Sequence, residues 1–254
     1  MRLEIPSCGS LFEGHFPGRP ILPAVALLDR ALRALASTGA PPTLRGVANL
    51  RLRQPVAPGD VLDLQARALA PGRARFEVRR ADEIVADGVV LLGEPSSAIA
   101  AWTPARGWRP PAGSPDLDDL LPHRPPMRMV EAVEGAADDG VECTARLPEG
   151  SAFDSGGTAP ALVALEMAAQ TAAVFEALRR FRETGRAGAR VGYLVGARDV
   201  GFGRARVPVG EAFRAAVRLS GMALPLCTYA FEVAREGEVV ASGTLSTWLT
   251  ATAA

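Results

Sequence analysis

The sequence contains no lysine, and its charge is balanced. All 28 cationic residues are arginine, and 28 acidic residues offset them, so the formal net charge is zero. A balanced charge argues against general binding to nucleic acid or to a membrane surface. We attribute the missing lysine mainly to the base composition of the source genome rather than to function.

Cysteine and long apolar runs are also scarce. The three cysteines, Cys8, Cys143 and Cys227, are far apart in the chain and show no metal-type spacing, which is typical of a reduced compartment. The N-terminus lacks a basic region followed by an apolar run, and no apolar run approaches the length of a membrane span. We therefore expect a soluble, cytoplasmic protein that holds no metal.

The length of 254 residues allows one large core or two modest ones. Residues 93–115 show no apolar periodicity and are rich in Pro, Gly, Ser and Ala. We expect Trp102 and Trp108 to hold this segment against a domain. The sequence thus predicts a first domain over 1–93, a linker over 94–115 and a second domain over 116–254.

Each half is predicted to contain one long helix and several antiparallel strands. Apolar residues at three- and four-residue spacing predict a helix over 24–36. Residues 158–160 resemble a helix start, and residues 161–181 are apolar on nearly every side, as in a helix wrapped by a sheet. Alternating apolar residues predict strands over 1–6, 47–53, 61–70, 75–80, 84–92, 127–134, 141–147, 191–203, 211–219, 226–235 and 239–249.

The two halves repeat one another. Phe76-Glu77-Val78 matches Phe231-Glu232-Val233 at an offset of 155, and Gly88 matches Gly243 at the same offset without a gap. A fixed offset over a whole segment indicates two copies of one structural unit. Because each helix is too apolar to stand alone, we predict an α+β fold in which a curved antiparallel sheet wraps each helix.

His15, one of only two histidines, lies in a loop dense in glycine and proline. Pro17, Pro20 and Pro23 each fix φ and remove a backbone donor, so the loop is stiff. Pro23 suits the first turn of a helix, which places the imidazole beside the positive end of that helix. A lone histidine is more often a half-buried loop residue, but these neighbours favour a functional role.

Glu166 is the second candidate for chemistry. The offset near the two helices is 137, so His15 corresponds to Ala152 and Asp29 corresponds to Glu166. A carboxylate among alanine, leucine and methionine is costly unless it is paired or protonated. Gln170 lies one turn further along the same helical face. Glu166 could also cap a strand or pair with an arginine, but its apolar surroundings favour a catalytic role.

Four short segments carry a resemblance to a known family. Residues 14–23 read GHFPGRPILP, residues 121–127 read LPHRPPM and residues 166–170 read EMAAQ, with related turns at 55–60 and 207–211. They are similar to the GHFPxxPxxP, LPHRxP, ExxAQ and PVxPGD motifs of the hotdog-fold β-hydroxyacyl-acyl carrier protein dehydratases of bacterial fatty acid synthesis. The arrangement also resembles the paired dehydratase subunits of aryl polyene gene clusters, here fused end to end.

The resemblance implies a double hotdog with one composite site between its halves. In that site His15 of the first hotdog would act with Glu166 of the second as the catalytic pair. The residues expected to contact the substrate are Phe16, Pro23, Ala24 and Gln170. The equivalent second site would pair Asp29 with Ala152, so it would lack a base and be inactive.

The implied reaction is loss of water from a 3-hydroxyacyl thioester. His15 suits the base that removes the C2 proton, and Glu166 in an apolar pocket suits the acid that protonates the C3 hydroxyl. Backbone N–H groups after Pro23 would stabilise the enolate. The family usually has glycine where this chain has Ala24, and the added methyl group narrows the approach to the thioester.

The same resemblance implies an acyl carrier protein as partner and a substrate carried on phosphopantetheine or CoA, with no metal or redox cofactor. The chain would be a monomeric double hotdog or a homodimer of double hotdogs. A basic rim for the acidic carrier would comprise Arg19, Arg51, Arg53, Arg204 and Arg206, although solvated surface arginines are the commoner case.

Two other functions stay open at this point. A hotdog thioesterase would use a helix carboxylate to activate water against the thioester, but the loop from His15 to Pro23 favours dehydration. A non-catalytic hotdog that binds only acyl chains or a partner is the second alternative, because one of the two sites lacks its histidine. For His123 we expect a structural role at the start of a strand rather than catalysis.

Overall fold

The computed structural model describes residues 1–35, 43–96, 113 and 115–253. Most of the predicted linker, including Trp102 and Trp108, falls on residues 97–112 and 114, outside the described residues, so the domain boundaries stay a prediction. Within the described ranges, no helix is both long and apolar enough to cross a membrane.

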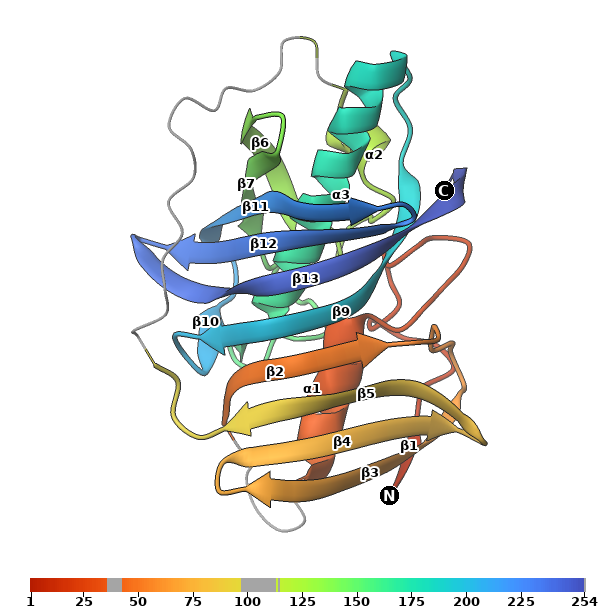
Figure 1. Cartoon of the computed structure of the whole chain (residues 1–254), viewed down its shortest axis with the longest axis vertical. Coiled ribbons are helices and arrows are strands. Elements are labelled where there is room, and N and C mark those ends of the chain that lie inside the picture. Colours follow the sequence, from red (N-terminus) through yellow and green to blue (C-terminus); the bar gives the residue numbers. More distant parts are fainter. Residues whose placement is uncertain (36–42, 97–112, 114, 254) are drawn as a thin grey trace.

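Each half contains one main helix and a set of strands (Figure 1). The first half contains β1 (Arg2–Glu4), α1 (Ala24–Leu35), β2 (Leu44–Leu52), β3 (Val61–Ala70), β4 (Arg73–Arg80) and β5 (Glu83–Leu92). The second half contains α2 (Leu117–Leu120), β6 (Val130–Ala136), β7 (Gly140–Arg146), β8 (Thr158–Pro160), α3 (Val163–Thr184), β9 (Arg190–Phe202), β10 (Arg206–Pro208), β11 (Ala212–Ala223), β12 (Leu226–Arg235) and β13 (Glu238–Ala253).

The strands of both halves join into one antiparallel sheet. Its order is β1-β3-β4-β5-β2-β9-β13-β12-β11-β7-β6. Outward from the β2–β9 junction, five strands on each side follow the same chain order, and β6 is an additional edge strand in the second half. At that junction Gly46 is opposite Gly201 and Leu50 is opposite Ala197. The sequence repeat is therefore a structural repeat, and backbone hydrogen bonds between β2 and β9 fix the two halves against each other.

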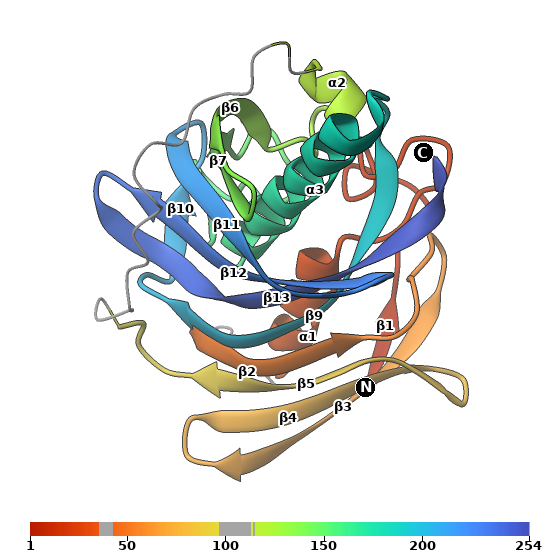
Figure 2. The same cartoon turned by 45° about the horizontal axis from the view of Figure 1, so that its top comes forward.

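The sheet curves around the two long helices (Figure 2). α3 packs against strands of the second half, and α1 contacts α3. The buried residues of α3 run from Val163 to Leu178 and lie on nearly every side of the helix. This burial explains why the helix is apolar on nearly every side. The predicted α+β double hotdog, with a curved sheet around each helix, is confirmed.

The repeated Phe and Gly residues form one feature in each half. Phe76 is opposite Gly88 across β4 and β5, and Phe231 is opposite Gly243 across β12 and β13. A Cβ atom on Gly88 would lie 2.6 Å from the backbone oxygen of Asn49 and 2.9 Å from the ring of Phe76. Glycine is required here because the ring covers it and the neighbouring strand approaches it closely.

Most predicted strands are confirmed within a few residues, and those over 61–70 and 226–235 have the predicted bounds. One prediction is wrong: residues 158–160 form β8, which pairs with β10, and the helix begins only at Val163. Pro160 is compatible with a two-stranded edge as well as with a helix start, so local preference did not distinguish them. The strand predicted from residue 127 begins at Val130.

Gly88→Ala is expected to lower the free energy of unfolding by about 1–3 kcal/mol, the usual cost of overpacking, because the new methyl group has no space. Denaturant titration measures the change. The control is Gly221→Ala in β11, where the nearest heavy atom to an added Cβ is 4.0 Å away. Equal losses in the two variants would contradict the close-packing explanation.

Candidate active site

The loop that carries His15 is held against the segment that carries His123. The backbone N–H of Arg124 donates to the carbonyl of Gly14 at 2.8 Å, and a Cβ atom on Gly14 would lie 1.9 Å from the backbone oxygen of Arg124. Gly14 also has a φ of 74°, a conformation that glycine adopts at little cost. Glycine at this position thus allows a first-half loop to contact a second-half loop.

His15 is buried and has a defined tautomer. Its Nδ1 lies 2.6 Å from the carbonyl oxygen of Ile21, and because a carbonyl only accepts, Nδ1 carries the proton in the neutral ring. Nε2 is then free to accept a proton. Burial lowers the pKa of His15 below its ordinary value of 6.5, while the charge of Glu166 and the hydrogen bond to Ile21 oppose the shift.

Glu166 lies in the first turn of α3 and is oriented by Gln170. Gln170 Nε2 donates to Glu166 Oε1 at 3.0 Å and to the carbonyl of Met127 at 2.9 Å. Gln170 Oε1 accepts from the backbone N–H of Met129 at 2.8 Å. Gln170 is fully buried, so it positions the carboxyl group and ties α3 to residues 127–129.

The structure corrects the position expected for His123, and its structural rather than catalytic role stays a prediction. This residue precedes β6 by several positions and does not start a strand. It is buried beside the two candidate catalytic groups: its Nε2 lies 3.6 Å from Glu166 Oε1, and its ring centroid lies 5.3 Å from that of His15. Burial lowers the pKa of His123 well below 6.5, and the charges of His15 and Arg124 lower it further.

Sequence reasoning named His123 but did not place it beside His15 and Glu166, because it has no periodic neighbours. The available signals were that it is the second of only two histidines and that it lies in the LPHRPPM segment. Its proximity to His15 depends on the contact between Gly14 and Arg124, which is a tertiary feature.

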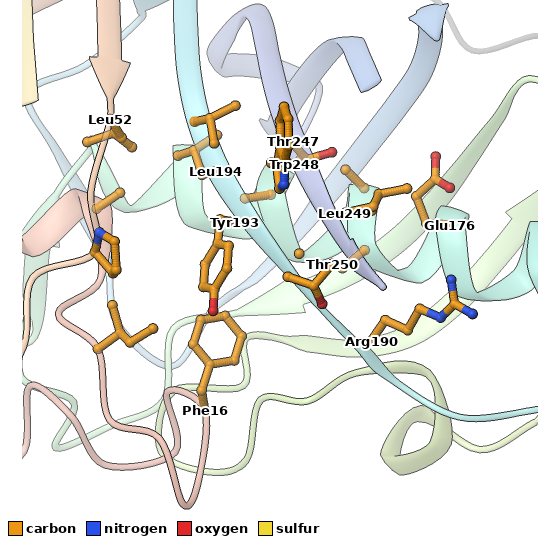
Figure 3. A pocket seen from close by; sticks show the side chains of 18 of the residues that line it. Phe16, Leu52, Glu176, Arg190, Tyr193, Leu194, Thr247, Trp248, Leu249 and Thr250 are labelled. Carbon is orange, nitrogen blue, oxygen red and sulfur yellow. The ribbon is translucent and has the colours of Figure 1, made fainter. Parts of the chain in front are cut away.

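These groups open into a cavity of about 870 Å³ between the two halves. Figure 3 shows part of its lining, with Phe16 and Tyr193 facing each other; their ring centroids are 6.0 Å apart in an edge-to-face arrangement. Of the expected substrate contacts, Phe16 and Ala24 line the cavity, whereas Pro23 and Gln170 are not among its lining residues. The structure thus brings His15 and Glu166 together and gives Gln170 a supporting position.

The expected second site has a different environment. Asp29 Oδ2 accepts from Arg33 Nε at 2.6 Å, one turn along α1, and neither Asp29 nor Ala152 is among the residues that line the cavity. The aspartate is therefore a polar helix contact in the described structure.

Three groups could bind a metal together. Ligand atoms of His15, His123 and Glu166 all lie within 4.8 Å of one another. Two ligands of the same zinc ion, with bonds of 2.0–2.1 Å, are at most about 4.2 Å apart. His15, His123 and Glu166 can take part in acid–base chemistry without a metal ion. That no metal is needed stays a prediction, which metal removal tests.

The arginines proposed as a basic rim mostly have partners within the chain. Arg51 and Arg53 pair with Asp87, Arg204 pairs with Glu238, and Arg206 donates to Thr158. Arg53 is the one member of that set that lines the cavity. The set does not form a ring of available cations around the opening.

Comparison with known proteins agrees with this geometry. The ApeI dehydratase family model matches residues 1–89, and the ApeP dehydratase family model matches residues 115–253. The two matches fall on the half that supplies His15 and on the half that supplies His123 and Glu166.

Curated relatives match shorter stretches. The FabZ 3-hydroxyacyl-[acyl-carrier-protein] dehydratase of Syntrophotalea carbinolica is 35% identical over 74 residues, which are 26% of this chain and 50% of that protein. The FabZ of Herpetosiphon aurantiacus is 35% identical over 99 residues, 32% of this chain and 66% of that protein. The matches thus span about half to two thirds of the length of these relatives.

A solved structure matches almost the whole chain. The dehydratase domain of PpsC from Mycobacterium tuberculosis, in complex with C12:1-CoA, has a TM-score of 0.71 and 17% identity, and covers 98% of this chain and 92% of that domain. At this identity the likeness supports the fold alone. Together with the family matches it leads to one assignment: the chain belongs to the ApeP dehydratase family, as a double hotdog whose N-terminal half matches the ApeI dehydratase.

Proposed function

We propose that the protein converts 3-hydroxyacyl thioesters into trans-2-enoyl thioesters at a single site formed by His15 and Glu166. The observation that carries this proposal is that an imidazole from one hotdog and a carboxyl group from the other share one buried cavity. Elimination of water from a 3-hydroxyacyl thioester requires a base at C2 and an acid at C3, and these two groups can supply both.

His15 acts as the base. Its Nδ1–H is directed at the Ile21 carbonyl, so Nε2 presents a lone pair toward the cavity. Because burial lowers the pKa of His15, the neutral ring predominates at pH 7. Removal of the C2 proton leaves the electron pair to form the C2–C3 double bond.

Glu166 acts as the acid. Its proton passes to the C3 oxygen as the C3–O bond breaks, so the leaving group departs as water. Gln170 donates to the same carboxyl group and fixes its orientation. After the reaction His15 holds the C2 proton and Glu166 has lost its own, and proton transfer between the two restores the site.

The thioester carbonyl lies at the start of α1 in this proposal. Ala24, the first residue of α1, lines the cavity, and the first N–H groups of a helix have no partners within the helix. Such donors and the positive end of the helix stabilise the enolate oxygen that develops when C2 loses its proton.

The substrate is attached to phosphopantetheine, on an acyl carrier protein or on CoA, within fatty acid or polyene-type biosynthesis. The support is the family match and the FabZ relatives, whose names specify acyl carrier protein substrates. A hotdog thioesterase is the alternative that an assay must separate, and it would release free thiol instead of enoyl product.

His15→Ala and Glu166→Ala are each expected to reduce enoyl formation by about 10²–10⁴-fold, the usual contribution of a positioned acid or base. Enoyl absorbance and free thiol are measured in parallel with a 3-hydroxybutanoyl thioester. Asp29→Ala is the matched control, because Asp29 lies outside the cavity and should retain activity. A loss in Asp29→Ala equal to that in Glu166→Ala would refute the single site.

The pH dependence of kcat/KM should show an acid limb with an apparent pKa under 6.5, because burial lowers the pKa of His15. Activity is therefore present at pH 7 and is lost as pH falls through that pKa, when Nε2 becomes protonated. Initial rates between pH 5 and pH 8 give the value. His123→Gln should keep the same limb, and disappearance of the limb in that variant would assign it to His123 instead.

Prolonged treatment with EDTA, followed by gel filtration, is expected to leave kcat unchanged, since proton transfer at His15 and Glu166 needs no metal. Metal analysis of the treated protein accompanies the assay. Loss of activity that returns on adding Zn²⁺ or Fe²⁺ would show that the buried trio functions as a metal site.

A further inference from the structure

The cavity continues well beyond the candidate catalytic pair. Its lining follows one face of α3 from Glu166 to Glu176 and on to Arg180. Ten residues of helix correspond to about 15 Å. The α3 wall of this stretch is made of small side chains, which are Ala169, Ala172, Ala173 and Ala177.

Strands β9 and β13 form the opposite wall. Figure 3 shows Leu249 of β13 beside Glu176 of α3, whereas Tyr193 of β9 lies further away, beside Phe16. Arg190, at the start of β9, lies toward the same end as Glu176 in this view. The alanines leave a channel between the helix and these strands.

The order of groups along the cavity sets the direction of an acyl chain, if the proposed function holds. The thioester carbonyl is at the start of α1, C2 is at His15 and C3 is at Glu166. Carbons beyond C3 then continue past Ala169 and Ala173 toward Glu176. The far end of the channel therefore contacts the distal end of the acyl chain.

That far end is polar. Glu176 is buried and accepts hydrogen bonds from Tyr229 Oη and from Arg179 Nη2, the latter at 2.8 Å. Burial and the charge of Glu176 raise the pKa of Tyr229, so its hydroxyl stays protonated and donates. A channel for a methyl-terminated chain would not need this buried charged cluster.

Buried polar atoms without a partner also line the channel. Thr247 Oγ1 and Arg179 Nε are buried and, within the described residues, make no hydrogen bond, and both residues line the cavity. Tyr193 Oη also has no partner there, but the ring of Tyr193 lies beside Phe16 at the catalytic end. Thr247 is only 6% exposed. Unsatisfied buried polar atoms are rare because each one costs free energy, so these atoms point to a polar ligand.

Arg180 and Arg190 add two positive charges at the same end. Both line the cavity, and neither side chain forms an ion pair or hydrogen bond with any other residue that the structure describes. Burial and the nearby charge of Arg190 lower the pKa of Arg180. By contrast, Arg179 on the same helix is paired with Glu176 and Glu183.

We propose that the distal end of the acyl chain carries an oxygen function, with a carboxylate preferred over a hydroxyl, and that Arg180 and Arg190 bind it. Guanidinium groups form strong charge-assisted hydrogen bonds with carboxylates. A methyl terminus would displace water from the polar end of the channel and would leave the guanidinium groups of Arg180 and Arg190 without an acceptor.

The channel length gives the chain length. Three extended backbone bonds advance about 3.3–3.6 Å, or about 1.2 Å per bond, so 15 Å corresponds to about 12 bonds beyond C3. A chain of about 15 carbons therefore places its terminus between Glu176 and the two arginines.

The test compares three pantetheine-linked chains of about 15 carbons that differ only at the terminus: carboxylate, hydroxyl and methyl. Saturated acyl-pantetheine amides, which cannot react, are titrated by calorimetry, so the result does not depend on turnover. The carboxylate is expected to bind about tenfold or more tightly than the methyl chain. A 3-hydroxybutanoyl thioester, too short to reach the arginines, reports on dehydration separately.

Arg180→Gln and Arg190→Gln should each remove most of the preference for the carboxylate while leaving the affinity for the methyl chain and turnover of the short substrate unchanged. Arg186→Gln is the control, because Arg186 is exposed and is not among the lining residues; it should keep the preference.

Equal or tighter binding of the methyl chain by the native protein would overturn the proposal. So would an equal loss of affinity for all three chains in the Arg180 and Arg190 variants, because that result assigns the arginines to the pantetheine arm. Failure to dehydrate the short substrate would instead count against the proposed function, and the binding preference would still decide this inference.

Discussion

The candidate site depends on one contact between loops from the two halves of the chain. The Gly14 carbonyl accepts from the Arg124 N–H, and the absence of a side chain on Gly14 lets the two backbones approach. This contact places His15 next to His123, while Gln170 holds the second loop to α3 and orients Glu166. Continuous pairing of β2 with β9 keeps the two halves in the register that this contact requires.

The site is asymmetric although the fold is nearly symmetric. Five strands on each side of the β2–β9 junction follow the same order, and the Phe–Gly pairs occur in both halves. The chemistry-bearing residues do not repeat: His15 corresponds to Ala152, and Asp29 bonds Arg33 on its own helix. A fold built twice thus supports one candidate site, and α3, the longer helix, supplies its carboxyl group.

The features of the fold that depend on local sequence pattern, which are the strands and the repeated units, could be predicted from the sequence. The alternation of apolar residues located the strands. The offset of 155 located the two repeated units, because Phe76 packs over Gly88 on the neighbouring strand and the same pair recurs in the second half. Residues 158–160 were misassigned because proline at the start of an element is compatible with a helix or with an edge strand. Strand register and the β2–β9 junction depend on long-range pairing and could not be inferred from local pattern.

The site was predictable only in part, for a related physical reason. His15 and Glu166 were visible because each is unusual in its own surroundings, a rigid proline loop and an apolar helix. His123 has no such local signal: its position beside His15 follows from a contact that spans 110 residues of sequence, and its position beside Glu166 follows from the hydrogen bonds of Gln170 to residues 127–129. The polar end of the channel joins α3 to β9 and β13, so Arg180, Arg190 and Thr247 have no sequence pattern in common.

The proposed mechanism requires that His15 and Glu166 of the same chain form the site. Mixing purified His15→Ala and Glu166→Ala proteins, including a step of joint unfolding and refolding, tests this requirement directly. If each site is built within one chain, every chain in the mixture lacks one essential group, and enoyl formation stays at the level of the single variants. Recovery of a substantial fraction of native activity in the mixture would show that the two groups come from different chains and would contradict the proposed mechanism.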